Sequence, residues 1–299
     1  MEKYYIGFDA GTQSVKVAVY DLEMNCLAEK VSPTHLYYPQ AGWVEMNVDE
    51  YLSAAKEGIK SCVQQLKEKG LNPDNIRAIF GDGIICGIAG VDENNNAVTP
   101  YINYLDSRTQ EDAENISQKN LSIWAEESGN PKPNCMFPAM TARWILKNNE
   151  NFKKHGTKFV HNAPYILSHL AGLKSCDAFI DWGTMSGWGL GFNVYKKEWS
   201  QKQLNILEID KKYMPKIVKP WDIIGGLTKE MADFTGLKEG TPICAGAGDT
   251  MQSMLGCGLI EKNMAADVAG TCAMFCVSTD GIKPELSSAE TGLIFNSGT

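Results

Sequence analysis

The N-terminal residues contain a short apolar run and then an alternation of apolar and polar positions, and both patterns are typical of short strands. Residues 4–8 form an apolar run that ends at Asp9, which predicts a buried strand. After a tight turn, valines recur with a period of two along residues 15–20, so a second strand is expected rather than a helix. Residues 26–31 favour a third strand. The chain should therefore open with an antiparallel meander.

A helical period replaces this alternation at Asn47. Asn47 suits the N-cap position, and Glu50 follows at the spacing of a capping box. The helix should run to about Glu68, just before Gly70. Its apolar stripe consists of Leu52, Ala55, Ile59, Cys62, Val63 and Leu66.

Strands and helices then alternate along the chain. We expect a strand over residues 76–80 and helices over 108–117, 141–147 and 164–173. Strands first, followed by helices that alternate with strands, indicate an α/β fold.

The C-terminal part returns to the opening pattern of a strand followed by a turn of small residues. Residues 243–247 predict a strand, and Gly248-Asp249-Thr250 begins a helix. A turn at Gly270-Thr271 separates strands that are expected over 266–269 and 272–277.

Composition and charge narrow the class of protein. The 299 residues include 28 Lys and Arg against 36 Asp and Glu, a net charge of −8, so no dense basic surface for nucleic acid is expected. The sequence has no apolar run of the ~18 residues that a membrane span needs, and no signal-peptide pattern. The nine cysteines are scattered without a C-x-x-C pair, which argues against a disulfide framework or a zinc site. We expect a reduced, cytoplasmic protein.

The turn after the first strand could bind phosphate. Gly11 allows close approach of the backbone, and the turn amides and the Thr12 hydroxyl can donate to phosphate oxygens. Asp9, at the strand end, can hold Mg²⁺ directly or through water. The lysine and the following helix of a Walker-type loop are both absent. A plain β-hairpin is the alternative, because D-x-G turns are common on that ground alone.

Asp249 follows a predicted strand within Gly246-Ala247-Gly248-Asp249. Small neighbours leave room for a substrate hydroxyl to reach the carboxylate, as a general base for phosphoryl transfer requires. An aspartate before a helix is equally suited to be its N-cap. Both interpretations stay open.

Asp106 and Arg108, in Tyr104-Leu105-Asp106-Ser107-Arg108, could hydrogen-bond the vicinal hydroxyls of a sugar. Most such pairs are structural or solvated, so the residues alone favour a structural ion pair. Gly42-Trp43-Val44-Glu45 could present an aromatic face to a sugar, although tryptophan more often packs in a core.

Taken in order, these motifs resemble those of the FGGY family of carbohydrate kinases. Residues 6–14 resemble its first phosphate motif, residues 42–45 its G-W-V-E stretch, and residues 104–108 its W-x-D-x-R segment. Further matches follow in the family's order: Ile224-Gly225-Gly226-Leu227, Thr235-Gly236-Leu237, Gly240-Thr241-Pro242-Ile243, Gly246-Ala247-Gly248-Asp249 and Gly270-Thr271.

The resemblance implies an actin/Hsp70-like (ribonuclease H-like) ATPase fold and ATP-dependent phosphorylation of a sugar or polyol hydroxyl. It implies that Asp249 is the catalytic base and that Asp9 and Asp249 hold Mg²⁺. The residues implied to bind the ATP phosphates are Gly11, Thr12, Gln13, Ser14, Gly270 and Thr271. Those implied to lie at the sugar are Ile85, Cys86, Asp106, Arg108 and Thr250.

The chain departs from the family at the sugar loop. Members that phosphorylate xylulose carry G-Q-M-H-G where this chain has Gly83-Ile84-Ile85-Cys86-Gly87, and the N-Q-R-E loop of glycerol kinases is absent. Thr250 stands where Asn or Gln often follows the base. The overall pattern is xylulokinase-like, but neither D-xylulose nor glycerol carries over as the substrate.

Family members are much longer than this chain. We expect residues 1–257 to form the N-terminal domain, with the sugar loops and the base, and residues 258–299 to form the opening strands of a truncated second domain. Weak or no turnover is expected from the fragment alone. A non-catalytic sugar-binding or sensor module is the alternative function. An apolar face left by an absent domain could drive self-association, so a homodimer is a further expectation.

Overall fold

The main sheet has the strand order β13-β14-β5-β1-β2-β3, with β15 also paired to β5. The computed structural model describes residues 2–118, 122–130, 132–269 and 273–280. The antiparallel meander β1-β2-β3 is confirmed, and β5 lies parallel to β1, β14 and β15. The strands are β1 (Tyr4–Ala10), β2 (Ser14–Tyr20), β3 (Cys26–Pro33), β5 (Ile76–Gly83), β13 (Ile223–Gly226), β14 (Pro242–Cys244) and β15 (Ala247–Gly248).

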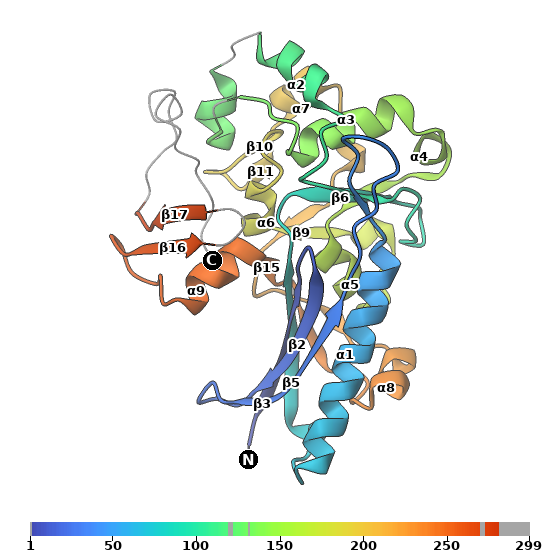
Figure 1. Cartoon of the computed structure of the whole chain (residues 1–299), viewed down its shortest axis with the longest axis vertical. Helices are drawn as coiled ribbons and strands as arrows, with labels where there is room; N and C mark the ends of the chain where they lie inside the picture. The colour runs from blue at the N-terminus through green and yellow to red at the C-terminus, as the bar shows by residue number, and fades with distance from the viewer. Residues whose placement is uncertain (1, 119–121, 131, 270–272, 281–299) are drawn as a thin grey trace.

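Three helices cover one face of this sheet: α1 (Val48–Glu68), α5 (Asn162–Ala171) and α8 (Lys229–Thr235) (Figure 1). Tyr4, Ile6, Phe8 and Ala10 alternate along β1 and are buried in the core beneath these helices. The residues between them are only partly buried. The opposite face of the sheet is therefore where Asp9 can meet a ligand.

Helix α1 begins where the sequence predicts. The Asn47 side chain accepts a hydrogen bond of 3.0 Å from the Asp49 amide, which confirms the N-cap. The capping box is wrong, because the Glu50 carboxylate accepts a hydrogen bond from the Tyr37 hydroxyl and lies 3.4 Å from Nδ1 of His35. Of the predicted apolar stripe, Leu52 is half-buried and the other members are buried, namely Ala55, Ile59, Cys62, Val63 and Leu66.

A second, four-stranded sheet has the order β4-β7-β6-β8. Its strands are β4 (Glu45–Met46), β7 (Tyr101–Asn103), β6 (Gly87–Val91) and β8 (Lys158–Val160). Around it lie α2 (Gln110–Ser117), α3 (Pro138–Asn148), α4 (Glu150–His155), α6 (Trp182–Ser186) and α7 (Gln201–Leu207). The helices predicted over 108–117, 141–147 and 164–173 correspond to α2, α3 and α5. Large aromatic side chains, including Trp124 and Trp188, fill a separate core here.

Short elements complete the fold. β9 (Phe179–Asp181) pairs with β12 (Lys216–Val218), and β10 (Phe192–Asn193) pairs with β11 (Glu198–Trp199). Single 3₁₀ turns lie at Pro73–Asn75, Ser175–Asp177 and Lys211–Tyr213, and a π turn lies at Trp124–Ser128.

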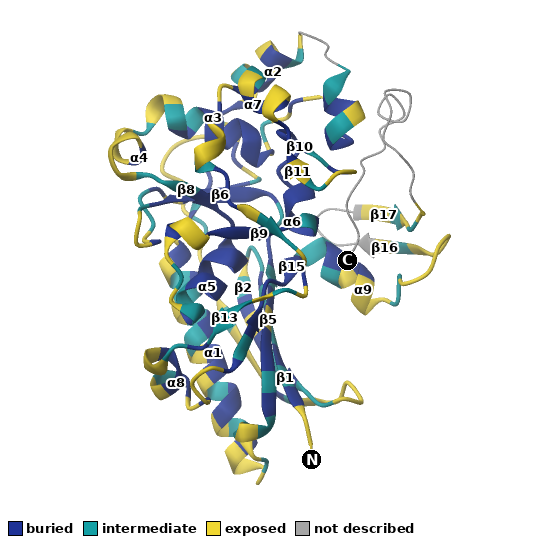
Figure 2. Ribbon diagram, turned by 180° about the vertical axis from the view of Figure 1, so that it is seen from behind, coloured by how far each residue is buried: buried dark blue, intermediate teal, exposed yellow. Residues whose placement is uncertain are grey.

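The C-terminal residues form a small lobe beside the main body (Figure 1). It consists of α9 (Asp249–Gly256) and the antiparallel pair β16 (Ala265–Ala269) and β17 (Ala273–Val277), as predicted. The central strands β1 and β5 are mostly buried or half-buried, whereas this lobe is largely exposed (Figure 2). Phe275 and Ile260 are 72% and 71% exposed. Within the described ranges, none of the helices has the length and apolar character needed to cross a membrane.

Candidate active site

A row of charged side chains crosses the main sheet near the ends of its central strands. Asp9 on β1 lies opposite Lys16 on β2 and opposite Asp82 on β5. Lys16 Nζ donates to Asp9 Oδ2 at 2.9 Å, and the Asp9 side chain is 31% exposed. The hydrogen bond to Asp9 raises the pKa of Lys16. Asp82 forms no ion pair with a described cationic side chain, although the charge of Lys16 lowers its pKa.

Asp9 and Asp82 place two carboxylates side by side without a donor between them. The Oδ1 atoms of both residues are buried and have no hydrogen-bond partner. Burial raises the pKa of Asp82 well above its usual range, and the charges of Asp9 and Asp249 raise it further. Like charges opposite one another across paired strands are destabilising. This pair therefore favours a positive charge or a proton between its oxygens.

Asp249 lies just beyond β15, the neighbour of β5. Gly248 occupies the N-cap position and Asp249 is the first residue of α9, so the N-cap interpretation of Asp249 is wrong. Its Oδ1 accepts hydrogen bonds from the Thr250 amide at 2.6 Å and from the Thr250 hydroxyl at 3.2 Å. Burial raises the pKa of Asp249 to about 6, although both bonds from Thr250 lower it. A carboxyl group of this kind is suited to accept a proton near neutral pH.

The approach to Asp249 depends on glycine. Gly246 has a φ of +71°, and a Cβ atom there would lie 1.8 Å from the carbonyl oxygen of Gly81 on β5. Only glycine fits this contact and this backbone conformation. The glycine lets β15 lie against β5 and brings Asp249 towards the two aspartates at the strand ends.

The turn between β1 and β2 is held by its carbonyl groups. The Thr12 carbonyl accepts a hydrogen bond from the Tyr51 hydroxyl at 3.0 Å, and the Gln13 carbonyl accepts one from the Thr34 amide at 3.1 Å. The Gly11 amide donates to the Ser14 carbonyl at 3.0 Å. No described group accepts a hydrogen bond from the amides of Thr12 and Gln13. Two amides of this turn can therefore donate to an anion.

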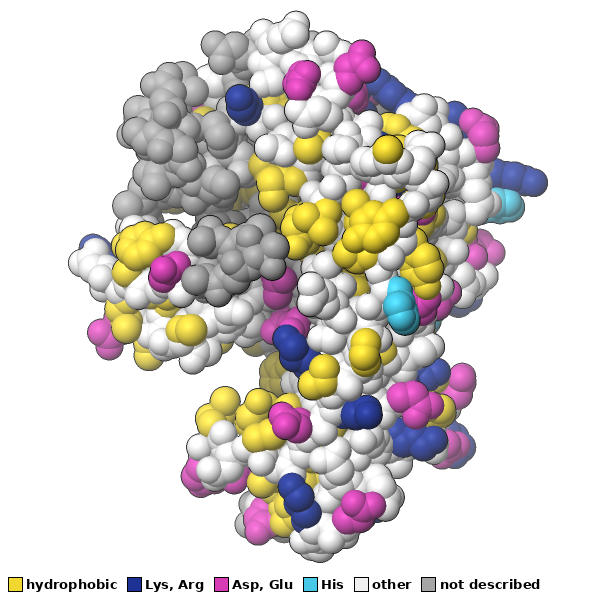
Figure 3. Space-filling view, viewed as in Figure 1, with side chains coloured by type: hydrophobic (Ala, Val, Ile, Leu, Met, Phe, Trp, Pro, Cys, Tyr) yellow, Lys and Arg dark blue, Asp and Glu magenta, His cyan; other side chains and the backbone are white. Residues whose placement is uncertain are grey.

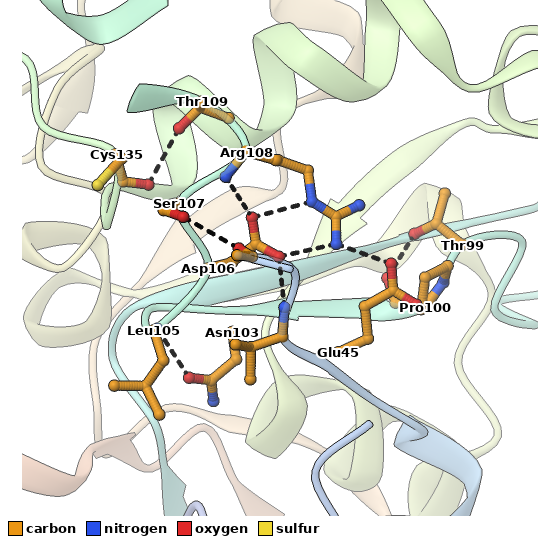
Figure 4. A network of polar contacts seen from close by, with 12 residues as sticks. Glu45, Thr99, Pro100, Asn103, Leu105, Asp106, Ser107, Arg108, Thr109 and Cys135 are labelled. Atoms are coloured by element: carbon orange, nitrogen blue, oxygen red, sulfur yellow. Dashed lines mark hydrogen bonds and ion pairs between the residues drawn. The ribbon is translucent and has the colours of Figure 1, made fainter. Parts of the chain in front are cut away.

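Asp106 and Arg108 form a closed ion pair at the edge of the second sheet (Figure 4). Arg108 donates from Nε to Asp106 Oδ1 at 2.9 Å, and its terminal nitrogen lies 2.8 Å from Asp106 Oδ2 and 2.7 Å from Glu45. Its side chain is 2% exposed, and the guanidinium lies 3.6 Å from the centre of the Trp43 ring. The Val44 amide also donates to Asp106, at 2.6 Å. These contacts favour a structural role for the pair.

Ile85 and Cys86 connect β5 to β6 and lie beside the strand that leads to Asp249. Cys86 Sγ donates to the carbonyl oxygen of Gly187 at 3.3 Å, and burial raises the pKa of this thiol to about 12. Ile85 packs against Gly248, where a Cβ atom would lie 1.9 Å from Ile85 Cγ2. The structure thus brings the predicted sugar loop next to the predicted base.

The comparison with known protein families agrees with this arrangement. The N-terminal domain of the FGGY family of carbohydrate kinases matches residues 4–256. The chain belongs to this family. FGGY kinases have the actin/Hsp70-like, ribonuclease H-like ATPase fold, so the predicted fold class is confirmed.

Individual relatives in the FGGY family are distant and longer than this chain. The chain is 26% identical over 296 residues to the gluconokinase of Bacillus subtilis (strain 168), a match of 99% of the chain and 55% of that protein. It is 26% identical over 286 residues to the glycerol kinase of Thermococcus kodakarensis, covering 94% and 54% of the two proteins. The crystal structure of gluconate kinase from Lactobacillus acidophilus matches with a TM-score of 0.81 at 25% identity, covering 92% and 54%. The chain spans about half the length of the curated relatives it matches.

Asp82 and Lys16 lie opposite Asp9 in this FGGY domain, and the sequence motifs did not single them out. With Asp9 and Gln252 they line a hollow of about 380 Å³ on the uncovered face of the main sheet. Acidic and basic side chains gather at the inner corner between the main body and the C-terminal lobe (Figure 3). The available signal was that Asp82, like Asp9, stands near the C-terminal end of a strand.

Two further predictions for the FGGY site concern the second phosphate turn and the metal ion. Gly270 and Thr271 lie outside the residues that the structure describes. Within the described ranges, no three or more His, Cys, Asp or Glu side chains form a group that could hold a metal ion on their own. A cation at this site would need ligands from a bound substrate as well.

Proposed function

We propose that the whole protein, whose N-terminal domain this chain supplies, transfers the terminal phosphoryl group of ATP to a hydroxyl of a sugar or polyol. The observation that carries the proposal is the placement of Asp249, a half-buried carboxyl, beside Asp9 and Asp82 at the ends of parallel strands. Ligands of open α/β sheets bind beyond the carboxyl ends of the strands. Membership of the FGGY family supports this assignment.

Asp249 is the base in this proposal. Its Oδ1 takes both hydrogen bonds from Thr250, and no described side chain or amide donates to its Oδ2. Oδ2 is therefore free to accept the proton of the attacking hydroxyl. Since the pKa of Asp249 is about 6, the carboxyl is mostly ionised above that pH. The same Thr250 bonds fix its orientation.

The β1–β2 turn binds phosphate in this proposal. The Thr12 and Gln13 amides and the hydroxyls of Thr12 and Ser14 supply donors, and Tyr51 holds the turn from behind. Phosphoryl transfer needs chiefly the positioning of the two reactants and stabilisation of charge. A fixed turn with free amides contributes to both.

Asp9 and Asp82, with Asp249 nearby, fit a magnesium ion that takes its other ligands from the nucleotide and from water. The unpartnered Oδ1 atoms of Asp9 and Asp82 are the observation behind this fit. Mg²⁺ commonly takes one or two protein carboxylates together with waters and substrate phosphates. When bound, the ion neutralises phosphate charge. Lys16 holds the other oxygen of Asp9 in place at 2.9 Å.

A coupled assay of ADP release by the whole protein tests the proposal. It uses MgATP and a panel of ketoses, polyols and aldoses. Asp249→Asn should lower the acceptor-dependent rate by roughly 10²- to 10⁴-fold and leave the acceptor Kd within about threefold. Asp177→Asn, on the surface of the Ser175–Asp177 turn, is the matched control and should keep the wild-type rate. Acceptor binding without ADP release would support the sensor function instead. An acceptor-dependent rate unchanged in Asp249→Asn would contradict the assignment of the base.

A further inference from the structure

Asn162 is a fully buried polar side chain that contacts the end of the central strand β1. It is the first residue of α5, one of the helices that cover the main sheet. Its Nδ2 donates to the Ala10 carbonyl oxygen at 2.6 Å, and its Oδ1 accepts from the Ala163 amide at 2.9 Å. A carbonyl oxygen can only accept and a main-chain amide can only donate, so these partners fix the orientation of the Asn162 amide. This side chain therefore ties the start of α5 to the end of β1.

Ala10 stands in a row of three paired strand ends. It pairs with Gly83 on β5, and Gly83 pairs in turn with Gly248 on β15. Each residue of this row directly adjoins one carboxylate of the site, and the three carboxylates are Asp9, Asp82 and Asp249. A Cβ atom on Gly83 would lie 2.6 Å from Asn162 Oδ1 and 3.0 Å from the Ala10 carbonyl oxygen. Glycine at this position thus lets the Asn162 amide lie against two of the three strand ends at once.

The bond from Asn162 also fixes the peptide that opens the β1–β2 turn. In a trans peptide, the carbonyl and the following N–H point in opposite directions. The Ala10 carbonyl points to Asn162, so the Gly11 amide points the opposite way. There it donates to the Ser14 carbonyl at 3.0 Å and closes the turn. The Ile84 amide also donates to the Ala10 carbonyl, but at 3.4 Å, so the bond from Asn162 is the shorter of the two that hold this peptide.

We propose that Asn162 is a positioning residue, which sets the β1–β2 turn and the neighbouring carboxylates in the geometry that phosphoryl transfer requires. This inference rests on the proposed function, because it assigns a further residue to the same site. Asn162 touches neither reactant, since the Ala10 carbonyl and the Ala163 amide take both of its polar atoms. Without its bond, the buried Ala10 carbonyl would keep only the longer contact with the Ile84 amide. A displacement of about 1 Å at the reacting groups can lower a rate by about 100-fold.

Asn162→Ala in the coupled assay of the whole protein tests the inference. The variant should lower kcat by roughly 10- to 100-fold and raise the KM for MgATP by roughly 3- to 10-fold. The KM for the acceptor should stay within about threefold, because the lost bond holds the phosphate turn. Asn151→Ala is the matched control: Asn151 on α4 donates from Nδ2 to the Val98 carbonyl at 2.7 Å, outside the main sheet. This control should keep the wild-type kcat and both wild-type KM values.

A second variant and the melting temperatures separate positioning from stability. The hydroxyl of Asn162→Ser suits the start of a helix but is one bond too short for the Ala10 carbonyl, so this variant should show the same kinetic loss. Wild-type kcat and KM for MgATP in both folded variants would leave Asn162 a structural role only, and the proposed kinase function would stand. Equal increases in the two KM values would indicate general damage to the site and would also overturn the inference. If the wild-type protein releases no ADP with any acceptor, the proposed function fails and the inference fails with it.

Discussion

Asp249→Asn should make the chain more stable at neutral pH, although it removes the proposed base. Burial raises the pKa of this carboxyl from 3.8 to about 6. The folded chain therefore holds the proton of Asp249 more tightly than the unfolded chain does, and loss of that proton lowers the free energy of unfolding. Asparagine is neutral at every pH, has a similar shape, and retains an oxygen that can accept the bonds from Thr250.

The size and the sign of this effect follow from the two pKa values. A pKa that changes from 3.8 to about 6 corresponds to about 3 kcal/mol. Solvent around the partly exposed carboxyl makes this an upper value. The destabilisation is fully present above about pH 6, decreases as the pH falls towards about 4, and is absent below that pH, where both states are protonated. For a chain of this size, 3 kcal/mol corresponds to a rise of roughly 5 °C in melting temperature.

Circular dichroism measures the melting temperatures of wild type and Asp249→Asn at about pH 4, pH 5.5 and pH 7.5. The variant should melt at a higher temperature at pH 7.5 and at the wild-type temperature at pH 4. Asp177→Asn, on an exposed turn, is the control for the loss of a surface carboxylate. A variant that melts at or below the wild-type temperature at pH 7.5 would refute the reasoning. An equal gain at pH 4 would assign the effect to packing rather than to charge.

Three further substitutions test other parts of the structure. Asp82→Asn should also raise the melting temperature at pH 7.5, because burial and two neighbouring carboxylates raise the pKa of Asp82. The same variant should weaken Mg²⁺-dependent nucleotide binding in calorimetry. An unchanged Mg²⁺ dependence would exclude Asp82 from the cation site. Arg108→Met should lower the free energy of unfolding by about 3–5 kcal/mol in a guanidinium titration, since it leaves the buried Asp106 carboxylate without its partner. A loss below about 1 kcal/mol would contradict the buried ion pair. Gly246→Ala should lower the free energy of unfolding by more than about 2 kcal/mol, because Gly246 has a φ of +71° and contacts β5. Gly256→Ala is the control and should be nearly neutral, because the space around its Cβ position is open. Equal effects of the two substitutions would contradict the close approach at Gly246.

Local patterns were enough to predict the opening strands and α1. A strand repeats every two residues and a helix every 3.6, so the valines of β2 and the stripe of α1 reveal their buried faces directly. The Asn47 cap is equally local. Glu50 shows the limit of such signals, because its carboxylate pairs with Tyr37, which precedes the helix in a segment of irregular structure.

The site itself depends on contacts between distant parts of the sequence. Asp82 meets Asp9 only because β5 lies parallel to β1 in one register, and parallel strands are joined by long connections that leave no short-range signal. The contact of Ile85 with Gly187 likewise joins two segments that no motif relates. Family motifs identified Asp9 and Asp249 singly. The register of the sheet determines that a third carboxylate stands with them.

The uncovered face of the main sheet accounts for both the position of the site and its electrostatic character. Alternate residues of β1 pack beneath the helices, so the residues between them point away from the helices. Because β5 alternates in the same way, Tyr5 lies near Phe80, with ring centres 6.2 Å apart, and Asp9 lies opposite Asp82. Gly7 lies between these two pairs, where a Cβ atom would meet nothing within 4 Å, so the face stays hollow there. The fold thus sets two carboxylates together at the rim of an open hollow, and Lys16 is the one cationic side chain among the described residues that line it. This excess of carboxylate charge over cationic charge, more than any single motif, suits this face of the sheet to a cation and the phosphates that accompany it.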